Sequence, residues 1–194
     1  MTDRAVYKKT AKFFPGKKPP SLPFNMKHDL WSTPVWHIEG APQQLVDELY
    51  EGAYKLKEIY PDDKKRSNEG GYQTPFLGWE DFHPQGIEYI DKVVGDNYKF
   101  KVKEWWYNIN GKGHWNTPHT HPKCDLALVW YLTDSDGLLH LMNPFSQRKN
   151  IDDHVGINAK KGDIIMFPSD IMHFVKPNQR DADRISISMN LQLC

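Results

Sequence analysis

The sequence predicts one mainly β domain with two helices near its start, built as a sandwich, jelly roll or barrel. Its 194 residues fit a single domain with a core of ordinary size. Two segments before residue 96 repeat apolar residues at the three- and four-residue steps of a helix. From residue 98 onward, short runs rich in β-branched and aromatic residues alternate with turn signals such as Asn110-Gly111, Asn143-Pro144 and Lys161-Gly162.

The elements are expected in the following order. Residues 1–27 are rich in proline and lysine and lack a hydrophobic period, so they predict an extended arm before a domain spanning 28–194. A first strand is expected within 31–39. A helix over 42–60 begins at Pro42 and carries an apolar stripe, and a loop follows over 61–71. A second helix covers 84–95. The remaining strands are expected at 98–110, 125–133, 138–142, 155–159, 163–167, 172–176 and 184–192.

Charge and cysteine content exclude several classes of protein. The chain has 25 basic and 25 acidic side chains, which argues against a dedicated binder of nucleic acid or of a membrane surface. Cys124 and Cys194 cannot form a disulfide framework, so a reducing, cytoplasmic location is expected. No apolar run has the length of a membrane span, and the N-terminus lacks the core of a signal peptide.

The nine histidines include one pair with the spacing of metal ligands. His119 and His121 flank Thr120, and on a strand two side chains one residue apart point to the same side. Such a pair could bind one metal ion, although surface pairs without a metal are common. His173 follows the buried strand expected at 163–167 and could return to the pair in a small barrel. The three together predict a metal site better than any one of them.

The last strand has two chemically different faces, which allow two interpretations. Its polar face could lie in water, as in many antiparallel sheets. It could instead line a barrel interior, where Arg184 would need an anion such as a carboxylate, with Ser186 adding a hydroxyl. The strand alone leaves both open. The polar face carries Arg184, Ser186, Ser188 and Asn190, and the apolar face carries Ile185, Ile187, Met189 and Leu191.

This combination resembles the non-haem Fe(II)/2-oxoglutarate-dependent oxygenases, which have a double-stranded β-helix (jelly-roll) fold. It is most similar to a bacterial and phage branch related to prolyl hydroxylases. The resemblance extends over residues 100–192 and rests on His119-Thr120-His121-Pro122, Val129-Trp130-Tyr131, Phe167-Pro168-Ser169 with His173, and Arg184 to Asn190.

The resemblance implies an oxygenase, specifically a hydroxylase, that couples 2-oxoglutarate decarboxylation to substrate oxidation with Fe(II) and O2, and with ascorbate as a candidate reductant. It places the metal on His119, His121 and His173, and 2-oxoglutarate on Arg184, Ser186 and Tyr131. Most relatives have a carboxylate at the position of His121. Asp125 is therefore an alternative ligand if the strand continues past Pro122. A small-molecule or peptidyl substrate is implied, and a homodimer is open.

Two other readings of the same residues stay open. A cupin would share the fold, with Gly113, His119, His121 and Asp125 approximating one motif and Gly162, Pro168 and His173 the other. Asp170 stands where that second motif expects glycine, and the Arg-x-Ser ending is not part of it. A non-catalytic jelly-roll module would give His114, His140 and His154 equal weight. The candidates for a substrate mouth are Trp105, Trp106, Tyr107, Asn108 and Trp115.

Overall fold

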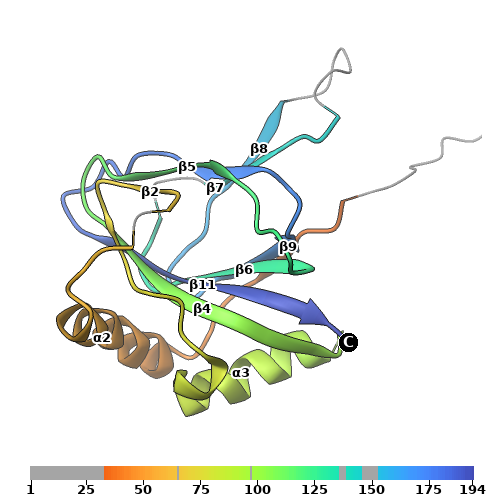
Figure 1. Ribbon diagram of the computed structural model, residues 1–194, viewed down its shortest axis with the longest axis horizontal. Coiled ribbons are helices and arrows are strands. Elements are labelled where there is room, and N and C mark those ends of the chain that lie inside the picture. The colour runs from red at the N-terminus through yellow and green to blue at the C-terminus, as the bar shows by residue number, and fades with distance from the viewer. Residues whose placement is uncertain (1–32, 65, 97, 136–138, 146–152) are drawn as a thin grey trace, which may run out of the picture. The chain divides into compact units, whose positions relative to one another are not determined.

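The computed structural model describes residues 33–64, 66–96, 98–135, 139–145 and 153–194, and the arm expected over 1–27 lies outside this range. Within it, two antiparallel sheets face each other (Figure 1). The larger sheet has the order β1-β9-β6-β11-β4-β3, and the smaller has β2-β5-β10-β7-β8. The strands are β1 (Trp36–Ile38), β2 (Asn68–Glu69), β3 (Tyr72–Gln73), β4 (Phe100–Asn110), β5 (Trp115–His119), β6 (Leu126–Tyr131), β7 (Leu139–Met142), β8 (His154–Ile157), β9 (Ile164–Pro168), β10 (His173–Val175) and β11 (Arg184–Leu193).

Both helices lie on the outer face of the larger sheet (Figure 1). Helix α2 (Gln43–Ile59) buries Leu45, Val46, Leu49 and Ala53 from the predicted stripe. The last members of that stripe, Ile59 and Tyr60, are exposed. Helix α3 (Pro84–Gly95) begins with proline, whose missing N–H has no partner to lose there, and it buries Ile90 and Val94. A 3-10 turn, η1 (Trp79–Asp81), precedes α3. Neither helix has the length and apolar character needed to cross a bilayer.

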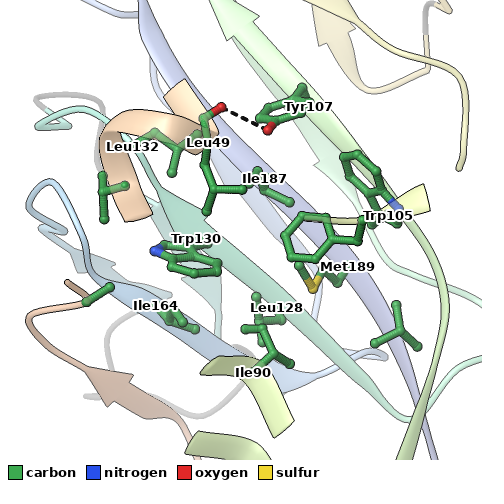
Figure 2. Packing of buried hydrophobic residues seen from close by; sticks show 14 of the residues in the cluster. Leu49, Ile90, Trp105, Tyr107, Leu128, Trp130, Leu132, Ile164, Ile187 and Met189 are labelled. Carbon is green, nitrogen blue, oxygen red and sulfur yellow. Dashed lines mark hydrogen bonds between the residues drawn. The ribbon is translucent and has the colours of Figure 1, made fainter. Parts of the chain in front are cut away.

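Strand β11 shows which face of the larger sheet packs in the hydrophobic core. Its four apolar side chains are fully buried and belong to the cluster that contains the helix residues. Figure 2 shows Ile187 and Met189 beside Leu49 and Trp105, together with the hydrogen bond from the Tyr107 hydroxyl to the Leu49 carbonyl oxygen (2.8 Å). Because helices cover this face, the polar side chains of β11 point between the two sheets. The interpretation that placed them in a barrel interior is therefore correct.

Strand β4 follows the same rule and corrects part of the predicted substrate mouth. Trp105 and Tyr107 are buried in the helix-side core, whereas Trp106 and Asn108 point to the opposite side, into the space between the sheets. Trp115, on β5, is 37% exposed. Alternation along a strand assigns neighbouring residues to opposite faces, so this group of five could not act together.

Three short strands were not predicted. Strand β2 lies in the segment expected to be a loop, and β3 follows directly after it. Each has two residues, too few to show an alternating pattern. Strand β5 has the sequence Trp-Asn-Thr-Pro-His, in which polar residues and Pro118 hide the strand. All three gain their place by pairing with strands far along the chain: β3 with β4, and β5 with both β2 and β10.

Candidate functional site

The three histidines converge between the sheets. His119 ends β5, and His173 begins β10 and lies directly opposite His119 in the antiparallel pair. Strand β5 ends at His119, and His121 lies just beyond it, before the turn at Pro122 and Lys123. The backbone N–H of His121 donates to the carbonyl oxygen of Ser169 (2.9 Å), which ties this segment to the end of β9. One ring nitrogen from each histidine lies within 4.8 Å of the others.

Hydrogen bonds determine which ring nitrogens carry the protons. The Nδ1 of His119 lies 2.7 Å from the Thr117 carbonyl oxygen, and that of His173 lies 2.9 Å from the Ile171 carbonyl oxygen. A carbonyl oxygen only accepts, so both Nδ1 atoms carry the proton and both Nε2 atoms keep a lone pair. The Nδ1 of His121 likewise faces the side-chain oxygen of Asn190 at 2.5 Å.

This arrangement suits a cation and not a hydrogen bond between rings. The Nε2 atoms of His121 and His173 are 3.2 Å apart, and with both protons on Nδ1 neither can donate to the other. Burial lowers the pKa of His121 to about 4 and that of His173 to about 3, and it also lowers the pKa of His119. The site therefore presents three neutral imidazole donors at pH 7, the form in which histidine binds metals.

A small cavity of about 40 Å³ is lined both by the three histidines and by Arg184 at the start of β11. Arg184 lies in this cavity and is only 4% exposed. Its guanidinium donates to the Lys176 carbonyl oxygen (3.1 Å), and no carboxylate of the described residues forms an ion pair with it. Burial lowers the pKa of this guanidinium and raises the pKa of Tyr131 to about 12. A buried cation among hydroxyls, here Ser186 and Tyr131, suits an anionic ligand.

Asp125, the alternative ligand, lies elsewhere. A turn containing Lys123 in the left-handed region (φ 69°) ends any strand after His121. The carboxylate of Asp125 accepts hydrogen bonds from the backbone N–H of Leu193 (2.8 Å) and from the Gln192 side chain. One of its oxygens, Oδ2, is thus used at the end of β11. The condition under which Asp125 could replace His121, an unbroken strand past Pro122, is not met.

A second cavity, of about 570 Å³, is also lined by His119 and His121 but not by His173. The two cavities share Ser67, Trp106, His119 and His121. One wall of the second is aromatic: the rings of Phe76 and Trp106 lie 4.6 Å apart, and the Arg66 guanidinium stacks 3.6 Å above Phe76. The sequence analysis missed Arg66 and Phe76, because no local pattern distinguishes them from loop residues and only the fold brings them to the site.

The sequence around this site matches a known protein family. Residues 104–190 match a family model described as "Putative 2OG-Fe(II) oxygenase". The matched range contains the three histidines as well as Tyr131, Arg184 and Ser186. Over these 87 residues, a little under half of the chain, the sequence matches the 2OG-Fe(II) oxygenase family. The predicted resemblance is confirmed, and with it an enzyme that uses Fe(II), 2-oxoglutarate and O2.

Solved structures share the oxygenase's fold at low sequence identity. HygX from Streptomyces hygroscopicus, with nickel and 2-oxoglutarate bound, aligns at 11% identity and a TM-score of 0.63, over 82% of this chain and 83% of its own. A Pseudomonas putida prolyl-4-hydroxylase aligns at 14% identity and a TM-score of 0.61, over 81% of this chain and 91% of its own. A prolyl hydroxylase from Trichoplax adhaerens, in complex with a hypoxia-inducible-factor peptide fragment, aligns at 16% identity and a TM-score of 0.58, over 82% of each chain. No curated protein sequence matches the chain. The predicted double-stranded β-helix is thus confirmed.

Proposed function

We propose that this oxygenase holds Fe(II) on His119, His121 and His173, holds the far carboxylate of 2-oxoglutarate on Arg184, and hydroxylates a small-molecule or peptidyl substrate. One observation carries the proposal. A single cavity is lined both by three histidines with convergent Nε2 lone pairs and by a buried guanidinium without a carboxylate partner among the described residues.

The residues of this cavity divide the binding of 2-oxoglutarate between them. Arg184 would neutralise and orient the far carboxylate, and Ser186 and Tyr131 would donate hydroxyl hydrogen bonds to it. Tyr131 stays protonated, because its pKa is raised to about 12, and it therefore remains a donor. When bound, Fe(II) would supply the redox chemistry that couples O2 to 2-oxoglutarate and substrate.

The second cavity is the proposed position of the substrate. It is lined by His119 and His121 but not by Arg184, so a substrate there would lie beside two proposed metal ligands and away from the proposed carboxylate site. Phe76 and Trp106 offer a flat apolar wall, and Arg66 offers a cation at its edge. These features suit a substrate with an apolar body and a polar group. The prolyl hydroxylases of similar fold make a peptidyl substrate one candidate, and HygX makes a small molecule the other.

The proposal is tested by succinate formation from 2-oxoglutarate with Fe(II), ascorbate and O2. Arg184→Ala should weaken 2-oxoglutarate binding by more than about a hundredfold, because the ligand's carboxylate would enter a cavity without its counter-charge. Arg180→Ala is the matched control, since Arg180 is half-buried, donates to the Asp134 carbonyl oxygen and does not line the cavity of Arg184. If Arg184→Ala binds 2-oxoglutarate like the wild type, the proposal is wrong, and turnover without 2-oxoglutarate would favour the cupin alternative.

The class of substrate is tested separately. The enzyme is incubated with a metabolite extract or with a peptide library, and mass spectrometry identifies species that gain one oxygen atom. A gain confined to peptides assigns the peptidyl class, and a gain confined to metabolites assigns the small-molecule class. The cytoplasmic location and the homodimer remain predictions, which cell fractionation and light scattering would test.

A further inference from the structure

We propose that Asn190 and Glu104 are positioning residues that hold His121 with its Nε2 toward the metal. The inference rests on the proposed function, because it concerns one of the three proposed ligands. His119 and His173 are each held by a carbonyl oxygen two residues earlier in their own chain segment. His121 follows the end of β5, and its Nδ1 is instead held by a side chain from another strand.

The hydrogen bonds permit only one orientation of this chain of groups. The amide nitrogen of Asn190 donates to a carboxylate oxygen of Glu104 (2.7 Å), and the amide oxygen of Asn190 lies 2.5 Å from the Nδ1 of His121. If the amide were flipped, its oxygen would face the carboxylate and two acceptors would repel each other. Glu104 therefore fixes the amide, the amide oxygen requires a proton on Nδ1 of His121, and the lone pair is left on Nε2.

Strand register explains why these residues meet. Asn190 lies directly opposite Glu104 in the antiparallel pair of β11 and β4, and both point between the sheets. Trp106 lies two residues after Glu104 on the same side of β4, and its ring stacks on His121 with centroids 5.6 Å apart and planes 20° apart. Asn190 is 6% exposed, so water has little access to compete for its amide. The ring of His121 is thus held by side chains of strands β4 and β11 and not by a carbonyl oxygen of its own segment.

Cobalt(II) binding to the metal-free full-length protein tests the inference without requiring activity. Affinity is measured by competition with a chelator, and the ligand set by visible absorption. Asn190→Ala should weaken cobalt binding by about ten- to a hundredfold and alter the spectrum, because His121 loses its fixed orientation. Glu104→Ala should act in the same direction, and Glu104→Gln should restore affinity, since its amide oxygen can still accept from Asn190.

The control is Gln192→Ala, which removes another β11 side chain that hydrogen-bonds to a carboxylate, that of Asp125, away from the histidines. This variant should bind cobalt like the wild type. If Asn190→Ala fails to fold, the inference is tested at the half-buried Glu104, by comparing the cobalt affinities of Glu104→Ala and Glu104→Gln. Wild-type affinity and spectrum in Asn190→Ala, or in Glu104→Ala, would overturn the inference. If the wild type itself does not bind cobalt, or if His119→Ala binds as tightly, the proposed function fails first.

Discussion

At the scale of single residues, the site is defined by where three protons lie. Each proposed ligand has its Nδ1 against an oxygen, and each therefore exposes a lone pair on Nε2. Two of these oxygens belong to the backbone and are present for any sequence that folds this way. The third belongs to Asn190, so one ligand depends on side-chain chemistry that substitution can change.

The choice between His121 and Asp125 leads to a direct prediction. His121→Ala should lower cobalt affinity by more than about a hundredfold, because it removes one of three donors. Asp125→Ala should leave cobalt affinity unchanged and lower the free energy of unfolding by about 1 kcal/mol, because it removes hydrogen bonds at the end of β11. Cobalt titration and urea denaturation measure the two effects, and a loss of cobalt binding in Asp125→Ala would contradict the ligand set.

At the scale of elements, β11 links the core to the chemistry. Its odd-numbered residues pack against α2 and α3, and its even-numbered residues include Arg184 at one end and Asn190 toward the other. A shift of register by one residue would exchange the two faces, placing the arginine in the apolar core and isoleucines in the cavity. The apolar face therefore determines where the proposed anion site lies.

The packing of this face is tested with Ile187, which is fully buried in the helix-side core (Figure 2). Ile187→Ala should lower the free energy of unfolding by about 2–5 kcal/mol, and Ile187→Val by about 1 kcal/mol, because the cavity left behind grows with the atoms removed. Val155→Ala, at a position on β8 that is 61% exposed, is the control and should change it by less than about 0.5 kcal/mol. Urea denaturation measures all three, and an alanine variant at position 187 as stable as the wild type would contradict this packing.

At the scale of the whole domain, the burial of neutral histidines between the two sheets makes the free energy of unfolding depend on pH. The pKa values of His121 and His173 are lowered by burial to about 4 and about 3, from an ordinary value of about 6.5. As the pH falls below 6.5, the unfolded chain binds protons that the folded chain cannot accept. The metal-free protein should therefore lose stability on acidification, by up to about 1.4 kcal/mol per pH unit for each of these histidines.

Thermal unfolding of the metal-free protein between pH 7 and pH 4 checks this expectation. The midpoint should fall as the pH falls, and the slope should be smaller in His173→Gln, which removes one of the titrating histidines. A saturating divalent metal ion should raise the midpoint at neutral pH, because it binds the folded state alone. A midpoint independent of pH over this range would contradict the burial of neutral histidines.

Local patterns in the sequence determined the helices, most of the strands and the two faces of β11. The reason is that apolar residues recur every 3.6 residues along a helix and every 2 along a strand, which nearby residues suffice to show. They also identified His119, His121, His173 and Arg184 as candidates. The parity argument placed His119 and His121 on one strand, whereas the strand ends at His119 and His121 lies just beyond it. Strands β2, β3 and β5 are too short or too polar to show a period of their own.

Only the tertiary structure decided whether the polar face of β11 lies in solvent or lines a cavity, because that depends on which side of the sheet the helices cover. It also removed Trp105 and Tyr107 from the substrate mouth, added Arg66 and Phe76 to the second cavity, and joined Glu104 and Asn190 to His121. These contacts connect residues far apart in the chain, and their geometry is set by strand pairing. The sequence alone determined which chemistry the chain can hold, and the pairing of distant strands decided which groups share a cavity.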